Sequence, residues 1–229
     1  MKKNIFFCMV SFLFLHSVSK AQESEWIVLF DGGSTDKLRG YNMQTFPGSW
    51  KTEDGALVTL TDVPNVDLVT KEAYKDFELE FEWKVSIAGN SGVFFHMQES
   101  LKHESGNGNS PNWLDNFEMQ ILDDINFNDK APIRSAGSLY DLISPQNKQL
   151  KPVGEYNLAK LIVKGNHVEH WLNGSKVLEY EIGSEEMNKL LKNSKFKNNP
   201  NYGKSPDGLI MFQHHGQKVW FKNIRIKRL

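Results

Sequence analysis

Residues 77–87 read FELEFEWKVSI, and this stretch indicates the fold class. Large apolar side chains occupy every second position from Phe77 to Trp83, and charged side chains occupy the positions between them, from Glu78 to Lys84. A period of two is that of a β-strand with one face in the core and the other in solvent. The stretch therefore predicts a strand of an antiparallel sheet that covers a core on one side.

Similar segments recur along the chain and are rich in β-branched and aromatic residues, the composition of strands. They are EWIVLF (25–30), GALVTL (55–60), DLVT (67–70), SGVFFHMQE (91–99), FEMQIL (117–122), GSLYDLI (137–143), AKLIVKG (159–165), HVEHWL (167–172), KVLEYEI (176–182), GLIMFQH (208–214) and KVWFKNIRI (218–226). About a dozen short strands predict an all-β sandwich of two antiparallel sheets.

Turn and helix signals agree with this architecture. Asn173-Gly174 and Asp54-Gly55 each stand between two strand segments, where both residues tolerate the positive φ of a type I′ hairpin turn. Residues 183–195, GSEEMNKLLKNSK, predict one short helix inserted between strands. Its expected N-cap is Ser184, followed by an acidic first turn that suits the helix dipole.

The first 21 residues predict a secretory signal peptide. Lys2 and Lys3 precede an apolar run from Ile5 to Leu15, and a small-residue pattern ends at Ala21. Because a membrane span needs roughly 20 apolar residues, we expect cleavage after Ala21 and no span afterwards. The expected product is a single domain, residues 22–229, located in the periplasm or secreted.

Composition limits the chemistry of the expected mature chain. Without the three lysines of residues 1–21, 24 Lys and Arg stand against 28 Asp and Glu, a formal charge of −4. No clustered basic face is apparent, which argues against nucleic-acid binding. The single cysteine, Cys8, lies in the predicted signal peptide, so we expect neither a disulfide nor a cysteine-ligated metal. The oligomeric state is left open.

Polar residues within otherwise apolar strands are the candidates for a site. In the stretch NFEMQILDD (116–124), Glu118 and Gln120 point to one face, and the three-residue step to Asp123 suggests a β-bulge that returns a third polar side chain to that face. The other candidates are His96, Tyr140, His170, Gln213, His215 and, in a long polar loop, Trp113. A lone histidine or aromatic residue is more often structural than functional, which is the alternative for each of these.

Seven motifs in order resemble the 3-keto-disaccharide hydrolase family over nearly the whole expected mature chain. They are LFDGGSTDKLRGY, GNSGVFFHMQE, FEMQILDD, GSLYDLI, KGNHVEHWLNGSKVLEYEIGS, SKF and GLIMFQHHGQKVWFKNIRI. The resemblance implies a concanavalin A-like jelly-roll sandwich whose concave sheet carries a sugar site. His215 takes the family's histidine position in Gln213-His214-His215-Gly216, whereas His96 stands where many members have an arginine.

This resemblance implies an enzyme that acts on 3-keto-glycosides. A ketone at C3 acidifies the C2 hydrogen, so a base could remove it and the C1 oxygen could leave by elimination, with or without later hydration. We assign catalytic roles to Glu118, Asp123 and His215, and substrate binding to Gln120, Gln213, Tyr140, Trp113 and His170. One divalent metal ion of unknown identity, held by His96, Glu118 and Asp123, is a further expectation, because a cation would stabilise the enolate.

Two alternatives remain open at this point. A laminarinase-like retaining glucanase carries Glu-x-Asp-x-x-Glu on a bulged strand, whereas this chain has Gln120 and Asp123 at the last two positions. A retaining mechanism needs two carboxyl groups about 5–5.5 Å apart, so the change weakens this alternative. The same fold also serves non-catalytic carbohydrate-binding modules.

Overall fold

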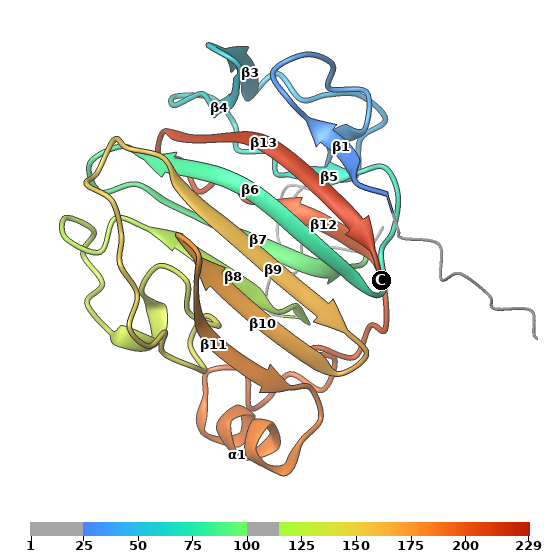
Figure 1. The fold of residues 1–229 in the computed structure, drawn as a ribbon, viewed down its shortest axis with the longest axis vertical. Coiled ribbons are helices and arrows are strands. Elements are labelled where there is room, and N and C mark those ends of the chain that lie inside the picture. Colours follow the sequence, from blue (N-terminus) through green and yellow to red (C-terminus); the bar gives the residue numbers. More distant parts are fainter. Residues whose placement is uncertain (1–24, 100–114) are drawn as a thin grey trace, which may run out of the picture.

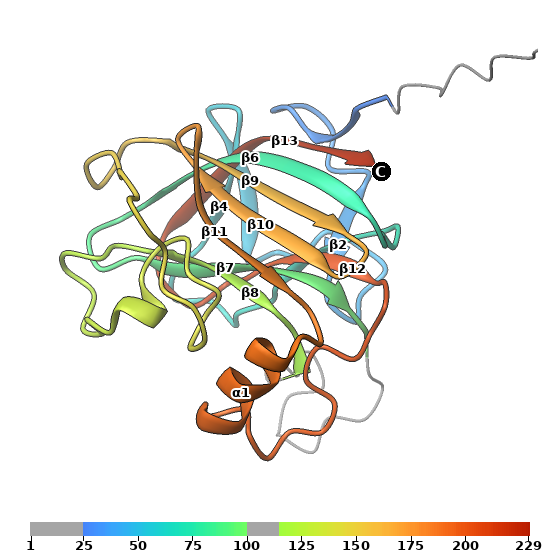
Figure 2. The same cartoon turned by 60° about the horizontal axis from the view of Figure 1, so that its bottom comes forward.

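The structure, a computed structural model, describes residues 25–99 and 115–229. Two antiparallel β-sheets pack face to face in these residues, as Figures 1 and 2 show. This arrangement confirms the predicted all-β sandwich. The predicted signal peptide and the candidate Trp113 lie outside the described residues.

The larger sheet has eight strands in the order β11-β10-β9-β6-β13-β4-β3, with β1 also paired to β13. Its strands are β1 (Ile27–Phe30), β3 (Trp50–Glu53), β4 (Ala56–Thr59), β6 (Phe77–Val85), β9 (Asn157–Lys164), β10 (His167–Leu172), β11 (Ser175–Glu181) and β13 (Val219–Arg228). The first and last described strands therefore meet at one edge of the fold, where Ile27 pairs with Ile226.

The smaller sheet has five strands in the order β2-β5-β12-β7-β8. They are β2 (Leu38–Gly40), β5 (Leu68–Thr70), β7 (Asn90–Met97), β8 (Glu118–Leu122) and β12 (Leu209–Phe212). Strand β7 follows β6 directly in sequence but belongs to the opposite sheet, so the chain crosses the sandwich between them.

The core lies between the two sheets and follows the alternation of the strands. In β6 the odd-numbered residues from Phe77 to Val85 are buried, and the even-numbered ones are half-buried on the outer face. In β8 the core-facing residues are Met119 and Ile121. Glu118 and Gln120 therefore point away from the core, onto the outer face of the smaller sheet.

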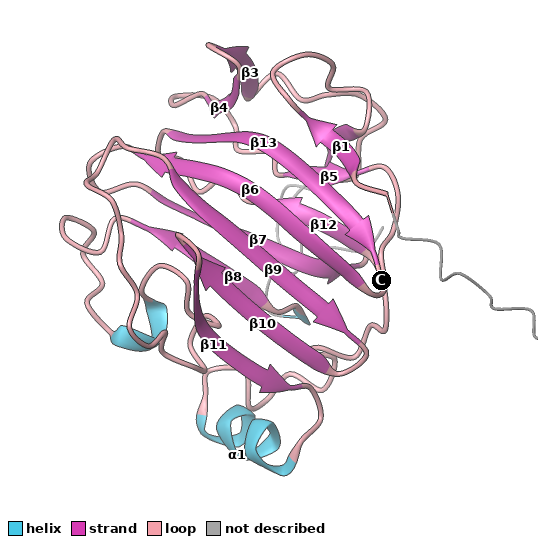
Figure 3. Ribbon diagram, in the orientation of Figure 1, coloured by secondary structure: helices cyan, strands magenta, loops and turns pink. Residues whose placement is uncertain are grey.

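The predicted turns and helix are confirmed. Asp54 and Asn173 both have positive φ, 51° and 48°, and each connects two antiparallel strands together with the glycine that follows. Figure 3 shows α1 (Glu185–Asn193), the one α-helix of the described residues, which follows β11. The side chain of Ser184 accepts a hydrogen bond from the Met187 backbone N–H. A short 3₁₀ helix, η2, spans Pro132–Arg134. Across residues 25–99 and 115–229, none of the helices has the length and apolarity to span a membrane.

Two local expectations are wrong. Strand β8 pairs with β7 in continuous register from Glu118 to Leu122, so the predicted bulge is absent, and Asp123 comes after the strand ends. Residues 137–143 do not form a regular strand. They make isolated bridges through Leu139 and turn sharply at Asp141, whose φ is 61°.

Candidate active site

The site is built on three neighbouring strands of the smaller sheet. Gly92 of β7 lies directly opposite Gln120 of β8, and on its other side the Gln213 backbone N–H donates to the Gly92 carbonyl at 2.9 Å. Two glutamine side chains therefore flank a position that has no side chain. The pairing of Gly92 with its two neighbouring strands thus leaves a gap on the outer face of the sheet.

The Glu118 side chain fills the gap at Gly92. A Cβ atom at residue 92 would overlap the Oε1 and Cδ atoms of Glu118, so only glycine admits the carboxylate in this position. No positive φ requires glycine here; the close approach does. Gly92 thus lets Glu118 lie back across β7.

A cavity of about 320 Å³ opens above this row. Its lining residues come from the sheet and from two segments that cover it: Asn90, Glu118, Gln120, Tyr140, Lys195, Phe196, Gln213 and His215. A volume near the lower end of ordinary ligand sites suits a small ligand such as one sugar ring. Buried amides and aromatic rings around a single carboxylate suit the hydroxyls and apolar faces of a sugar.

Backbone pairing places the covering segment that carries Tyr140. The Gly137 N–H donates to the Gln120 carbonyl at 2.8 Å, and the Tyr140 N–H donates to the Glu118 carbonyl at 3.0 Å. This short pairing along the free edge of β8 holds the Tyr140 ring beside the cavity.

Glu118 has the electrostatic properties of a base that works near neutral pH. Its side chain is only 8% exposed, and within the described residues no group donates a hydrogen bond to its carboxylate. Burial raises its pKa to about 8; Lys195 opposes this shift and Asp67 adds to it. A carboxyl group desolvated in this way holds its proton well above pH 4.5, and its anion is a stronger base.

One wall of the cavity is a cation held over an aromatic ring. The Lys195 Nζ lies 4.0 Å from the centre of the Tyr140 ring, within the range of a cation–π interaction. Asp141 joins the two covering segments, because its carboxylate accepts from the Arg134 Nε at 2.6 Å and from the Lys195 backbone N–H at 3.3 Å.

Of the residues predicted for the site, Glu118, Gln120, Gln213, Tyr140 and His215 line this cavity together. The two glutamines are buried, and His215 is exposed at the rim. The Nδ1 atom of His215 lies 3.0 Å from the side-chain oxygen of Gln217, at hydrogen-bond distance. Its other ring nitrogen, Nε2, is the one available to a ligand.

Asp123, predicted as a catalytic residue and metal ligand, lies elsewhere. Its carboxylate accepts hydrogen bonds from the backbone N–H groups of Ala88, Ile125 and Asn126 and from the Asn126 amide, at 2.8–3.0 Å. Burial opposes ionisation, but these hydrogen bonds prevail and lower its pKa. Asp123 therefore closes the turn after β8 and contributes to a different cavity.

The histidines predicted as a metal ligand and as a substrate contact are both buried in the interior. The His96 Nε2–H donates to the Lys75 carbonyl at 2.8 Å, and its ring packs on Phe95. His170 is fully buried and its Nδ1–H donates to the Gly137 carbonyl, while burial lowers its pKa to about 4. Neither lines the cavity of Glu118.

The predicted metal ligands His96, Glu118 and Asp123 are therefore not brought together. Among the described residues, one group of three has the geometry to hold a metal: His167, Glu169 and Glu179, whose ligand atoms lie within 4.8 Å of one another. This group lies on β10 and β11 of the larger sheet, away from the cavity. It already contains a cation, because the Lys176 Nζ lies 2.5 Å from Glu179 and 3.4 Å from Glu169.

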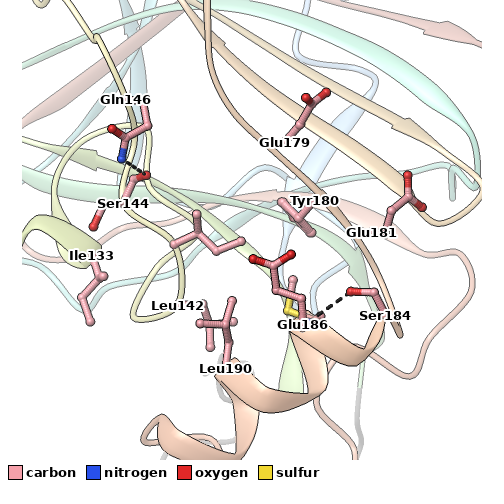
Figure 4. A pocket seen from close by; sticks show the side chains of 12 residues that line it. Ile133, Leu142, Ser144, Gln146, Glu179, Tyr180, Glu181, Ser184, Glu186 and Leu190 are labelled. Atoms are coloured by element: carbon pink, nitrogen blue, oxygen red, sulfur yellow. Dashed lines mark hydrogen bonds between the residues drawn. The ribbon is translucent and has the colours of Figure 1, made fainter.

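A second, larger cavity of about 520 Å³ lies between α1, β11 and residues 133–146 (Figure 4). Apolar side chains such as Leu142 and Leu190 line it, with glutamates around them. Glu179 and Glu181 extend from β11 and already bind Lys176 and His167. Unlike Glu118, the glutamates that line this cavity, Glu179, Glu181 and Glu186, are all exposed.

Three lining residues were not predicted: Asn90, Lys195 and Phe196. Lys195 and Phe196 belong to the motif SKF, which was recognised in the resemblance without a role for either residue. Asn90 is the second residue of the motif GNSGVFFHMQE. Lys195 and Phe196 carry no periodic signal, because they lie in the segment after α1 and their position depends on how it packs over the sheet. Asn90 is the first residue of β7, on the same face as Gly92.

Comparison with known proteins identifies the family of this chain. Residues 25–227 match the family described as the 3-keto-alpha-glucoside-1,2-lyase-like domain. The chain is 37% identical over 227 residues to a 3-keto-disaccharide hydrolase of Bacteroides thetaiotaomicron, covering 89% of this chain and 78% of the relative.

Solved structures support the same assignment. A "putative glycosyl hydrolase" from Parabacteroides distasonis superposes with a TM-score of 0.81 at 32% identity, covering 94% of this chain and 98% of that one. A Bacillus subtilis protein with a galectin-like fold, 15% identical, superposes with a TM-score of 0.58 and covers 90% and 97% of the two chains. The second likeness shows the fold alone. Together with the family match, these relatives show that the chain belongs to the 3-keto-disaccharide hydrolase-like family of jelly-roll glycosidases.

Proposed function

We propose that this protein cleaves the glycosidic bond of 3-keto-glycosides, with Glu118 as the base that removes the C2 proton. The observation that carries the proposal is the Glu118 carboxylate, buried at the base of a sugar-sized cavity with a pKa raised to about 8. The C2 hydrogen of a 3-keto sugar is a weak acid, so its removal needs a base stronger than an ordinary carboxylate.

The reaction would proceed in two steps with the atoms balanced. The proton moves from C2 to Glu118, and the C2–H electron pair forms the C2=C3 bond of an enolate. When the C3 ketone re-forms, the electrons move to C1=C2, the C1–O bond breaks and the aglycone leaves as an alcohol after taking up a proton. Addition of water at C1 of the unsaturated product would give net hydrolysis.

The remaining lining residues have roles that fit this reaction. Gln120 and Gln213 flank Glu118 and offer amide groups to ring hydroxyls, and the rings of Tyr140 and Phe196 offer apolar faces. His215 stands at the rim with Nε2 free of a partner among the described residues, and we assign it the proton that the leaving aglycone takes up.

A retaining glycosidase on unoxidised glucan would need a second carboxyl group beside Glu118. Asp123, which would supply it, closes a turn and contributes to another cavity. Among the described residues that line the cavity, Glu118 is the one carboxylate. The geometry therefore favours elimination over double displacement.

The test compares a 3-keto-disaccharide with its unoxidised parent, with and without a chelator, with products followed by NMR. We expect cleavage of the ketone substrate only, and deuterium at C2 of recovered substrate in D₂O if proton removal is reversible. Glu118→Gln should lose about 10²- to 10⁴-fold in kcat. Equal cleavage of the parent disaccharide would exclude the elimination route, and a fully active Glu118→Gln would exclude this site. A loss of turnover with chelator, restored by divalent metal, would add a metal ion to the mechanism.

A further inference from the structure

The elimination route needs a second group besides the base, because negative charge develops on the C3 oxygen as the C2 proton leaves. Positive or hydrogen-bonding groups aimed at such an oxygen contribute strongly to catalysis. Within the described lining of the cavity, Lys195 is the one lysine or arginine. We infer that Lys195 is a catalytic residue whose ammonium group binds the C3 oxygen and stabilises the enolate; this inference rests on the proposed function.

Several contacts fix the position of Lys195 although its side chain is exposed at the cavity mouth. Its backbone N–H donates to Asp141, which Arg134 holds in turn. Its Nζ lies 4.0 Å from the centre of the Tyr140 ring and 5.2 Å from that of Phe196. Two aromatic rings that line the same cavity therefore keep the ammonium group beside the space that a sugar would fill.

The positive charge of Lys195 and the negative charge of Glu118 suit the removal of the C2 proton. Before the reaction, Lys195 faces the Glu118 carboxylate, and its charge favours the ionised form of that group. During proton removal, the negative charge passes from Glu118 to the C3 oxygen while the Lys195 ammonium group remains at the wall of the same cavity. One fixed cation can thus stabilise the reactive base first and the enolate afterwards, with little rearrangement.

Other charged or titratable groups near Glu118 cannot replace this cation. Asp67 raises the pKa of Glu118, and Tyr202 interacts with Glu118 across the interior as a neutral phenol whose own pKa burial raises. Tyr140 supports the Lys195 ammonium group with its ring. His215 remains at the rim, where its Nδ1 already contacts Gln217.

The experiment isolates enolate formation from departure of the aglycone. The 3-keto derivative of 1,5-anhydroglucitol has no aglycone at C1, so in D₂O removal of its C2 proton is followed as exchange of the C2 hydrogen without release of an alcohol. The exchange rate is followed by NMR for the wild type, Lys195→Met, Lys195→Arg and Lys192→Met. Lys192 is a matched control, because it is an exposed lysine three residues earlier, in the last turn of α1.

We expect Lys195→Met to lose about 100- to 1,000-fold in exchange rate, as on removal of one oxyanion donor. Lys195→Arg should stay within about tenfold of wild type because the charge is kept, and Lys192→Met should be unchanged. The limb of the pH profile that reports Glu118 should move to higher pH in Lys195→Met, because the cation that lowers its pKa is gone. A purely structural role for Lys195 would not move this limb.

Two outcomes would overturn the inference: exchange by Lys195→Met within about threefold of wild type, or a large loss without a shift of the pH limb. Glu118→Gln, measured in the same assay, separates this inference from the proposed function. If Glu118→Gln is inactive while Lys195→Met is active, only the role of Lys195 fails. If Glu118→Gln exchanges at the wild-type rate, the proposed base fails as well.

Discussion

Strand β6 carries glutamates at alternate positions and strand β8 carries one, Glu118, and these glutamates differ in their burial and in their partners. On β6, Glu80 faces the outer side of the larger sheet, where the Lys160 Nζ lies 3.1 Å away and the Arg225 Nη2 lies 2.5 Å away. On β8, Glu118 lies under two covering segments with no hydrogen-bond donor among the described residues. Partners and desolvation, more than residue type, therefore decide which carboxylate can act as a base.

The outer face of the larger sheet is a layer of paired charges. Glu78 and Glu82 bind lysines as Glu80 does, and Lys84 and Lys222 lie over the ring of Tyr156. Such partly exposed pairs contribute little to stability individually. The carboxylates of this face are therefore already paired with cations of the same sheet.

The largest effect is expected from a substitution that fills the gap at Gly92, where the Glu118 carboxylate lies. Gly92→Ala places a methyl group where the carboxylate now lies, so Glu118 must move away from Gln120 and Gln213. We expect a loss of about 10- to 100-fold in kcat, since displacements near 1 Å can cost this much. Turnover of a 3-keto-disaccharide measures the effect. Gly48→Ala, where a Cβ meets no atom within 4 Å, is the matched control, and equal activity of the two variants would contradict this geometry.

A second test uses the pH dependence of stability. Burial raises the pKa of Glu118 to about 8, whereas the unfolded chain has its ordinary value near 4.5. Between these values the folded state holds the extra proton, so stability falls as pH rises from about 5 to 8 and levels off above 8. The Glu118→Gln variant does not pay the cost of ionising a buried carboxyl group. We therefore expect it to be more stable than wild type by about 1–3 kcal/mol at pH 9 and nearly equal to it at pH 4.5.

Thermal or urea unfolding of both proteins at the two pH values measures this difference. Glu80→Gln is the control, because its carboxylate lies in an ion-pair network on the outer face. A Glu118→Gln variant that gains the same stability at both pH values would show that the carboxyl group is not titrating as described.

The smallest effect is expected on the outer face itself. Glu80→Gln removes one member of the network with Lys160 and Arg225, whose side chains are 31% and 49% exposed. Because solvent screens such pairs, we expect a change in stability below about 1 kcal/mol and turnover within twofold of wild type. Urea unfolding and a turnover assay check both numbers. A large loss of turnover would mean that the outer face takes part in function.

Most of the fold could be predicted from local patterns in the sequence, chiefly the alternation of apolar and polar residues. The alternation in residues 77–87 correctly divides β6 into a buried and a half-buried face, and the same logic places Glu118 and Gln120 together on one face of β8. Ser184 and the Asn173-Gly174 turn behave as expected because capping and turn preferences depend on adjacent residues.

Contacts between distant segments could not be read in this way. Asp123 was expected to return to the face of Glu118, but it accepts three hydrogen bonds from the turn after β8 and one from the Ala88 backbone N–H instead. His96 and His170 have the residue type of ligands, yet the structure satisfies one nitrogen of each with a backbone carbonyl in the interior. The burial and the hydrogen-bond partners of such side chains depend on which distant segments pack against them.

The sandwich, the helix, the hairpin turns and the common face of Glu118 and Gln120 could be predicted from the sequence, because each depends on spacing within one segment. The shared cavity of Lys195 and Glu118, and the room that Gly92 leaves for the carboxylate, follow from the folded arrangement of the chain. Lys195 is 77 positions from Glu118 in the chain, and Gly92 is 26 positions from it. The physical reason is that pKa and reactivity depend on desolvation and charge at short range in space, and the packing of distant segments sets both.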